Sequence, residues 1–238
     1  LKYLPWMQAN YVMAASNEAV EYLPEGYDIN ALSYDEFIDW MRVLAEETGQ
    51  PRFGFPAGPD GLKHRFFQGF LLPSYAGSTV TKFNSPEAIE GWEKFRELWQ
   101  YTNPASTNYG FLQEPLLSGD VWVGFDHVAR LADAFDQRPG DFVAFPAPAG
   151  PVGRGFMPVL AGIAIPANAP DMEQSMALAT YMMQPETQVA TLLATSFFPT
   201  TDAELPDDLP ASAQALGAAI TAMTSGEDAL PALLPVGL

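Results

Sequence analysis

The stretch at residues 119–166 constrains the fold most, because it holds two apolar runs, 121–125 and 159–165, that are bounded by polar or turn-forming residues. The first run has the length of a buried strand and ends at Asp126. Arg154 precedes the second run, in a loop rich in proline and glycine. Because α/β proteins bind ligands where strands end and loops begin, we expect the functional site in this stretch.

Strand-like and helix-like segments alternate along the rest of the chain. Strands are expected at residues 3–14, 53–56, 121–125, 142–145 and 159–165. Helices are expected at residues 33–48, 62–72, 85–101, 111–117, 172–183, 186–194 and 212–223, with a further helix after residue 127. This order predicts a mixed α/β fold.

Local signals define several of these boundaries. Ser33 and Glu36 have the spacing of a capping box, and Ser85 stands before a proline that suits a first helical position. The segment 73–77 is expected to break the helix before it, and the glycines around Arg154 predict a flexible loop. Apolar side chains at helical spacing are expected to pack in the core, namely Ile89, Trp92, Phe95 and Trp99.

The composition indicates a folded chain with an acidic surface. Its 238 residues are 48% hydrophobic, which is enough to bury a core, and its formal net charge of -18 argues against a nucleic-acid partner. No apolar stretch reaches the ~20 residues that span a bilayer, so a membrane-spanning protein is not expected. The chain begins without an initiator Met or a signal peptide, so we expect a fragment whose export signal lies upstream.

The sequence does not indicate metal, nucleotide or nucleophile chemistry. The chain has no cysteine, and His64 and His127, its 2 histidines, do not have the spacing of metal ligands. It has neither a GxSxG elbow nor a phosphate-binding glycine motif, so no metal, cofactor or catalytic residue is expected. A glycan-processing enzyme using Asp126 and Glu114 is the remote alternative.

The polar groups of the central stretch suit a binding site. Asp126 and Arg130 lie one helical turn apart, and Arg154 supplies another guanidinium. Sugars are bound by directional hydrogen bonds together with aromatic faces, and the aromatic candidates are Trp6, Tyr11, Phe66, Tyr75 and Phe156. A surface ion pair between Asp126 and Arg130 accounts for their spacing equally well.

Two other segments allow both a structural and a ligand-binding interpretation. The N-terminal segment, 3–14, alternates polar and apolar side chains, as in a half-exposed strand or a strand that faces a cleft. His64 and Arg65 form a basic pair beside an aromatic cluster. Such a pair is typical of a helix surface and also suits a polar ligand with an apolar face.

Four stretches carry a resemblance to a known family: YLPWMQANYVMAASNEAVEYLPEG, EPLLSGDVWVGFDHVARL, FPAPAGPVGRGFMPVLAGIAIP and YMMQPETQVATLLATSFFPTTDAEL. In order and spacing the sequence resembles the extracellular solute-binding proteins of ATP-driven importers, in the carbohydrate-binding family related to maltose-binding protein. The resemblance implies a periplasmic-binding-protein-like (type II) α/β fold with two lobes joined by hinge strands, here incomplete. It implies a hinge crossing at residues 1–12, a C-terminal lobe at 13–156, a returning part of the N-terminal lobe at 157–201, and a second hinge with the first C-terminal helices at 202–238.

The resemblance also implies a function and a set of contacts. The protein would be a monomeric, non-catalytic carbohydrate-binding component, periplasmic or lipid-anchored, that delivers its ligand to the permease of an ABC transporter. The implied ligand contacts are Trp6, Gln8, Asn10, Tyr11, His64, Arg65, Phe66, Asp126, His127, Arg130, Arg154 and Phe156. Ala129 stands where the family often has a tryptophan, which removes the usual stacking contact. Together, Arg65, Arg130 and Arg154 suggest the alternative of an anionic ligand, such as a sugar phosphate or a sugar acid.

Overall fold

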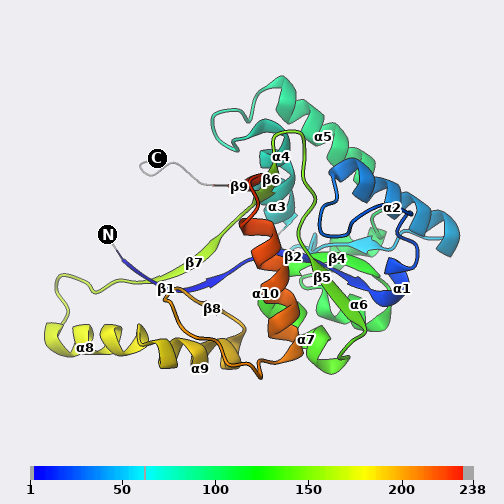
Figure 1. Cartoon of the computed structure of the whole chain (residues 1–238). Helices are drawn as coiled ribbons and strands as arrows, with labels where there is room; N and C mark the ends of the chain where they lie inside the picture. Colours follow the sequence, from blue (N-terminus) through cyan, green and yellow to red (C-terminus); the bar gives the residue numbers. More distant parts are fainter. Residues whose placement is uncertain (1–2, 62, 233–238) are drawn as a thin grey trace.

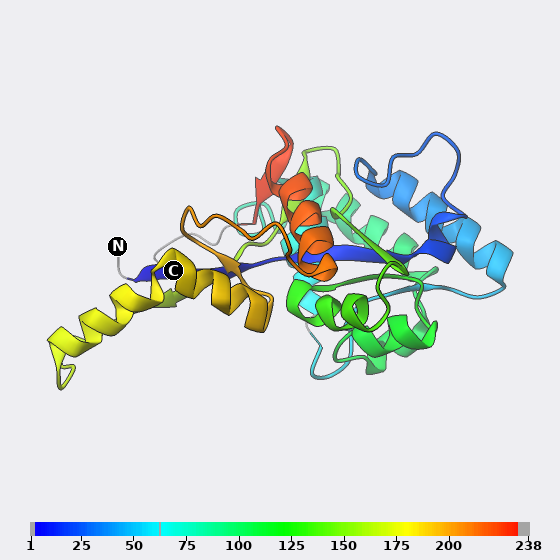
Figure 2. The ribbon, with the colours of Figure 1, turned by 60° about the horizontal axis from the view of Figure 1, so that its bottom comes forward.

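The computed structural model describes residues 3–61 and 63–232 and shows the mixed α/β fold that the sequence predicted. Within these two ranges, no helix has both the length and the hydropathy needed to cross a bilayer. A larger body is built around a four-stranded sheet, and a smaller arm with a three-stranded sheet projects from it (Figure 1, Figure 2).

One extended segment near the N-terminus connects the arm to the larger body (Figure 1). It consists of β1 (Leu4–Ala9) and β2 (Tyr11–Ser16), so the single strand expected at residues 3–14 is divided at Asn10. β1 is the central strand of the arm's sheet, whereas β2 is an interior strand of the larger sheet. Because β2 is covered on both faces, its residues are almost all buried and show no alternation of polar and apolar side chains.

The larger sheet has the strand order β3-β4-β2-β5, with β3 at Phe53–Gly54, β4 at Val123–His127 and β5 at Phe142–Phe145. β4 runs parallel to β3 and antiparallel to β2, and this register places Tyr11 opposite His127. The rings of Phe53, Phe55, Phe66, Phe70 and Phe125 are buried and form much of the core beside this sheet. The sheet therefore fixes the positions of the side chains at the end of β4.

β4 begins two residues later than the expected strand at 121–125. The amide of Val121 bonds to the carbonyl of Pro115 at 3.1 Å, so it is held by the preceding helix and not by the sheet. β4 also continues to His127, two residues beyond the expected end, because Asp126 and His127 pair with Val12 and Tyr11 of β2. Asp126 therefore lies inside the strand, where it is fully buried, and the prediction that it follows the strand is wrong.

Helices with clear end signals surround the larger sheet. They are α1 (Asn17–Val20), α2 (Tyr34–Thr48), α5 (Pro86–Trp99), α6 (Gln113–Ser118), α7 (Val128–Gln137) and α10 (Ala211–Thr224). The predicted capping box is present, since Ser33 Oγ accepts from the amide of Glu36 at 3.2 Å and the Glu36 carboxylate accepts from the amide of Ser33 at 2.8 Å. A short 3₁₀ helix, Pro104–Asn108, follows α5.

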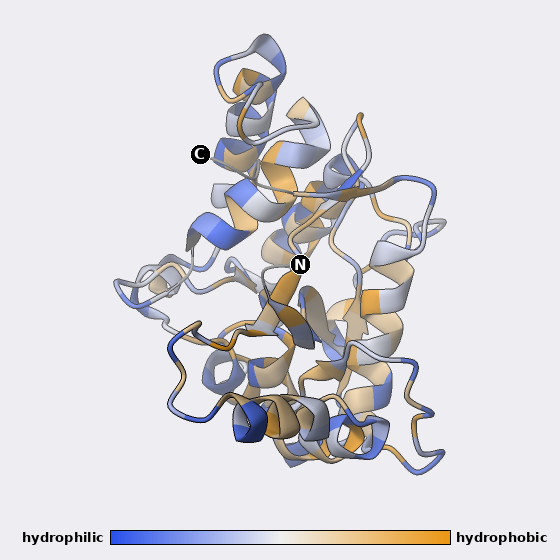
Figure 3. Cartoon of the chain, turned by 90° about the vertical axis from the view of Figure 1, so that its left-hand side faces the viewer, coloured by the Kyte–Doolittle hydropathy of each residue, from blue (hydrophilic) through white to orange (hydrophobic). Residues whose placement is uncertain are grey.

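The arm combines β1 with β7 (Val159–Ile163), β8 (Phe198–Pro199), α8 (Met172–Met182) and α9 (Pro185–Thr195). Buried Gln188 holds the start of the returning chain, because its Oε1 accepts from the amide of Thr200 at 2.9 Å. Most helices of the molecule carry both hydrophobic and hydrophilic residues, as expected when one helix face is buried (Figure 3). On α8 and α9, however, large apolar side chains are also exposed, namely Met176, Leu178, Tyr181 and Leu193.

The helix expected at 62–72 does not break at Pro73. α3 (Lys63–Phe66) continues through a π-helical turn, Phe67–Leu71, into α4 (Leu72–Ala76). In the widened turn the amide of Leu72 bonds to the carbonyl of Phe67, five residues earlier. Because the hydrogen-bond pattern changes at this turn, Pro73 lies in the first turn of α4. Proline is tolerated there, since its missing amide would have no intrahelical acceptor.

The glycine segment around Arg154 is an ordered turn and not the flexible loop that the sequence predicted. Gly150 and Gly153 exchange backbone hydrogen bonds of 2.9 and 3.2 Å, and the chain then enters β6 (Arg154–Phe156), which pairs in parallel with β9 (Ala229–Pro231). β6 packs directly on the helical segment, because the amide of Gly155 donates to Ser74 Oγ at 2.8 Å.

The apolar face of α5 is only partly in the core. Phe95 is partly buried, but Ile89 is 61% exposed, Trp92 46% and Trp99 40%, so the prediction that all four are core residues is wrong. Helical spacing identifies the apolar face of a helix, but it does not show whether another element covers that face.

Replacing Gly155 with alanine is expected to lower the free energy of unfolding by about 1–3 kcal/mol, the usual cost of overpacking. A Cβ there would lie 2.2 Å from the carbonyl oxygen of Phe70, so β6 would have to move away from the helical segment. Urea denaturation followed by circular dichroism measures the effect. Gly110→Ala is the matched control, because nothing lies within 4 Å of its Cβ position; equal stabilities of the two variants would contradict this packing.

Candidate functional site

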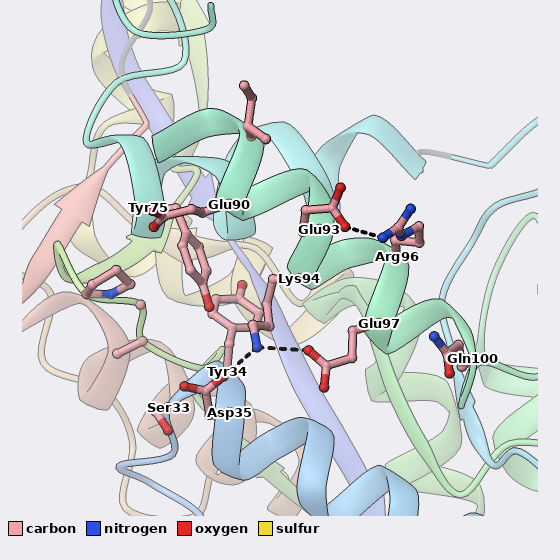
Figure 4. A pocket seen from close by; sticks show the side chains of 14 residues that line it. Ser33, Tyr34, Asp35, Tyr75, Glu90, Glu93, Lys94, Arg96, Glu97 and Gln100 are labelled. Carbon is pink, nitrogen blue, oxygen red and sulfur yellow. Dashed lines mark hydrogen bonds and ion pairs between the residues drawn. The ribbon is translucent and has the colours of Figure 1, made fainter. Parts of the chain in front are cut away.

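A large groove between α2 and α5, about 770 Å³ in volume, is lined in part by charged side chains (Figure 4). Lys94 Nζ lies 2.6 Å from the Asp35 carboxylate and 2.8 Å from that of Glu97, and Arg96 pairs with Glu93. Since Lys94 and Arg96 already have carboxylate partners, the groove offers a ligand little unpaired positive charge. We therefore place the candidate site elsewhere.

The end of β4 brings together four side chains that the sequence singled out, Tyr11, Arg65, His127 and Arg130, which are called the arginine cluster below. The Tyr11 and His127 rings meet edge to face, with centroids 5.1 Å apart, because the two residues are opposite each other across β2 and β4. Both rings are almost fully buried. Arg65 comes from α3 and Arg130 from α7, so four separate elements of the fold, β2, α3, β4 and α7, supply the cluster.

Buried Asp126 holds Arg130 in place. Its carboxylate accepts hydrogen bonds from the amide of Leu112 at 2.9 Å, from the amide of His127 at 2.7 Å and from Arg130 Nη1 at 3.1 Å. Burial raises the pKa of Asp126 to about 6, and the backbone hydrogen bonds and Arg130 oppose that rise. The carboxylate is thus ionised at pH 7 and neutralises the charge of Arg130.

Aromatic side chains flank the cluster on two sides. The guanidinium of Arg130 lies over the ring of Phe111, 4.3 Å from its centroid, which is cation–π geometry. The ring of Phe197, from the segment that precedes β8 of the arm, lies 5.4 Å from that of His127. Neither phenylalanine carries a local signal in the sequence, because both reach the cluster only through the fold.

Arg65 differs from Arg130 in its surroundings. In the described parts of the chain, its Nε is buried without a hydrogen-bond partner, and its Nη1 lies 3.2 Å from the thioether sulfur of Met157. No carboxylate lies within salt-bridge distance of Arg65 in the same parts of the chain. Sulfur is a weak acceptor, so the guanidinium keeps most of its hydrogen-bonding capacity.

Burial and the two nearby guanidinium groups, Arg130 and then Arg65, lower the pKa of His127 to about 4. The imidazole is therefore neutral at pH 7. Its Nδ1 accepts a hydrogen bond from the amide of Ala129 at 3.2 Å, which leaves the proton of the neutral ring on Nε2. His127 thus caps α7 with one nitrogen and retains a donor on the other.

Three other predicted contacts, Gln8, Asn10 and Phe156, line a different cavity of about 550 Å³ between β1 and α10. Gln8 donates from Nε2 to the carbonyl of Pro199 at 2.9 Å, while the Asn10 side chain accepts from the amide of Tyr11 at 3.1 Å. His64 is exposed and lines an aromatic depression beside Trp92. The structure does not bring these residues into the arginine cluster.

The remaining predicted contacts have structural surroundings. Phe66 is fully buried among core phenylalanines, with its ring centroid 4.9 Å from that of Phe125. Arg154 is 5% exposed, donates to the carbonyl of Ala147 at 2.6 Å and lies 3.5 Å from the carboxylate of Asp228. Trp6 is partly buried on the arm strand. Phe66 and Asp126 are fully buried, and the guanidinium of Arg154 is held by Ala147 and Asp228. In this conformation these three residues position their neighbours.

Across residues 3–61 and 63–232, no group of three or more His, Cys, Asp or Glu side chains is arranged to hold a metal ion. The donors that converge at the arginine cluster are cationic or neutral. Such a set suits an oxygen-rich or anionic small molecule and is unsuitable for a cation.

A sequence profile described as bacterial extracellular solute-binding protein matches residues 1–218. The chain belongs to this family. No curated protein sequence matches the chain. The family is one of binding proteins, in agreement with the resemblance of the four sequence stretches described above.

Solved structures show the same fold. Maltose-bound MalE3 of T. maritima is 19% identical with a TM-score of 0.71, over 97% of this chain and 62% of that chain. A chitin oligosaccharide binding protein is 15% identical with a TM-score of 0.72, and the match covers 98% of this chain and 62% of that chain. UgpB of Mycobacterium tuberculosis, in complex with glycerophosphocholine, is 20% identical with a TM-score of 0.64, and the match covers 83% of this chain and 51% of that chain. This solute-binding chain therefore has the type II periplasmic-binding-protein fold and spans about three fifths of the length of the first two.

The imidazole of His127 is expected to titrate with a pKa of about 4, because burial disfavours its charged form and because Arg130 and Arg65 repel a further positive charge. Its folded-state pKa lies below its unfolded value, so acidification from about 6.5 to 4 removes stability. Proton NMR of the imidazole C–H signals measures the midpoint. The variant His64→Gln assigns the signal, since the chain has 2 histidines, and a midpoint at or above 6.5 would contradict this arrangement.

Asp126→Asn is expected to lower the free energy of unfolding by about 1–3 kcal/mol, the cost of leaving buried hydrogen-bonding groups unsatisfied. The amide keeps one acceptor, but its NH₂ group faces donors and Arg130 loses its counter-charge. Thermal and urea denaturation measure the loss. Asp133→Asn, an exposed position on α7, provides the control; a change no larger than that of the control would show that Asp126 does not hold the site together.

Proposed function

We propose that the protein is the substrate-binding component of an ABC importer, which captures a carbohydrate solute between two lobes and delivers it to a membrane permease. It acts outside the cytoplasmic membrane, in the periplasm or attached to the cell surface by a lipid, and it binds its ligand as a monomer without chemical turnover. Membership of the extracellular solute-binding family supports this proposal.

The observation that carries the proposal is the position of the arginine cluster at the junction of arm and body. Its rings and guanidinium groups belong to the larger body, whereas Phe197 reaches His127 from the arm. A solute held there would contact both parts of the chain. Its binding would thus favour one relative position of arm and body, which is the signal that a permease needs.

The proposed lobes follow from the strands that cross between arm and body. We assign residues 1–12 to a hinge crossing, 13–156 to the C-terminal lobe, 157–201 to a returning part of the N-terminal lobe, and 202–238 to a second hinge with the first helices of the C-terminal lobe. The pairing of β1 with β7 and β8, and the return of α10 to the larger body, support these boundaries.

A carbohydrate is favoured over other solutes by the mixture of groups at the cluster. Tyr11 and His127 supply hydroxyl and imidazole groups for directional hydrogen bonds, and Phe111 and Phe197 supply aromatic rings for the C–H face of a sugar. Structural neighbours whose names mention maltose and chitin oligosaccharide point to the same ligand class. We propose that the ligand contacts are Tyr11, Arg65, His127 and Arg130. The contact set does not include Trp6, Gln8, Asn10, His64 and Phe156.

Isothermal titration calorimetry of the full-length protein tests the proposal with neutral mono- and oligosaccharides, polyols, sugar phosphates and sugar acids. We expect saturable binding of one ligand class, with one ligand per protein. Chromatography of the ligand after incubation checks that it is recovered unchanged. Lack of binding across the whole panel would sink the proposal, and conversion of the ligand would favour the enzyme alternative.

Phe197→Ala is expected to weaken binding of the ligand found in that titration by about 3- to 10-fold, since an aromatic contact contributes ~0.5–1.5 kcal/mol. Phe83→Ala is the matched control, because Phe83 is 49% exposed and lies away from the cluster. If both variants bind as well as the parent protein, the ligand does not reach the junction of arm and body.

A further inference from the structure

The arginine cluster concentrates positive charge in a chain that has little of it. The protein has 11 Lys and Arg against 29 Asp and Glu, yet two guanidinium groups, Arg130 and Arg65, are close enough to the nearly buried imidazole of His127 to help lower its pKa. Groups of like charge repel one another when they are partly removed from water, so their convergence needs a compensating charge.

Asp126 compensates one of the two cations. It lies 3.1 Å from Arg130 Nη1, and it is fully buried on the protein side of the cluster. Its remaining acceptor capacity is used by two backbone amides. Within the described residues the Asp126 carboxylate pairs with Arg130 and forms no ion pair with Arg65.

Arg65 has no such partner in the described parts of the chain. Its Nε is buried and unpaired, and its Nη1 contacts the sulfur of Met157 at 3.2 Å. A half-buried guanidinium with a thioether as its recorded acceptor loses the hydration of its donors without gaining equivalent bonds. A bound oxyanion would restore those bonds, because its oxygens match the planar donors of a guanidinium.

The other groups of the cluster are compatible with an anion. The neighbouring carboxylate of Asp126 points into the protein, where it is held by Leu112, His127 and Arg130. Tyr11 and neutral His127 offer a hydroxyl and an Nε2–H group, and both can donate to an anionic oxygen. A ligand entering between Arg65 and Arg130 would thus meet donors on several sides.

We propose that the transported solute carries an oxyanion group, a phosphate or a carboxylate, and that Arg65 is its counter-ion while Arg130, fixed by Asp126, supplies a second donor. This inference rests on the proposed function, since it names the chemical class of the solute bound at the same site. Arg65 is then the residue that distinguishes an anionic sugar from its neutral parent.

The test compares matched pairs of solutes by calorimetry on the full-length protein: glucose with glucose 6-phosphate, glycerol with glycerol 3-phosphate, and galactose with galacturonate, together with inorganic phosphate. We expect at least 10-fold tighter binding of one anionic member than of its neutral partner, in line with the strength of charge-assisted hydrogen bonds. Tighter binding of a sugar phosphate identifies phosphate as the preferred oxyanion, and tighter binding of galacturonate identifies carboxylate.

Variants at Arg65 make the test specific. Arg65→Met is expected to weaken binding of the anionic ligand at least 10-fold and binding of a neutral partner much less, because only the anion loses a charge-assisted hydrogen bond. Arg65→Lys keeps a point charge, so its affinity for the anion is expected to lie between those of Arg65→Met and the parent protein. Arg96→Met is the control, since Arg96 is exposed and pairs only with Glu93 on its own helix in the described structure. If Arg65→Met does not fold, the parent protein's affinity at 50 and 500 mM salt gives the same information, because ionic binding weakens with salt.

Each outcome decides the proposal. Equal binding of neutral and anionic partners, or an Arg65→Met variant that binds the anion as tightly as the parent, overturns the inference and leaves the proposed function standing. Absence of binding by any solute removes the proposed function and the inference together. Preference for an anion that disappears in Arg65→Met and persists in Arg96→Met supports both.

Discussion

The buried carboxylate of Asp126 is the interaction on which the site depends. It joins three parts of the larger body, because it bonds to the amide of Leu112 before α6, to the amide of His127 at the end of β4 and to Arg130 on α7. A charge is stable in such a place only when several donors surround it. The same three contacts direct the His127 ring and the Arg130 side chain toward one location. The Asp126 carboxylate thus contributes both to the stability of the fold and to the shape of the site.

Much of the local structure could be predicted because it depends on near neighbours in the sequence. The capping box of Ser33, the start of α5 at Ser85 and the strand at Phe142–Phe145 are confirmed. The errors arose where distant segments decide the outcome. Burial of Trp92 depends on what covers α5, and the shape of the turn at Gly153 depends on Asp228, whose carbonyl lies 2.5 Å from the position of a Cβ at that glycine.

The candidate site could be predicted in part for the same reason. Arg130 was selected for its spacing from Asp126, Tyr11 as an aromatic candidate and His127 through the family resemblance. The meeting of Tyr11 and His127 depends on the pairing of β2 with β4. Phe197 and Phe111 carry no local signal, since each reaches the cluster through the fold. Conversely, Arg154 resembled a ligand contact in its glycine-rich context, although tertiary packing buries it against Ala147.

The π-helical turn Phe67–Leu71 has a consequence for how this site could have arisen. Such a turn holds one residue more than an α-helical turn, which is the local result of a single inserted codon. Residues before it are rotated by roughly 100° about the helix axis relative to an uninterrupted helix, given 3.6 residues per turn. Arg65 precedes the turn and Pro73 follows it, so removal of one codon from the turn would swing the guanidinium away from Tyr11 and His127 while α4 stayed against β6. Insertions and deletions at this turn are thus a route by which related chains can gain or lose a cation in the binding site without a change of fold.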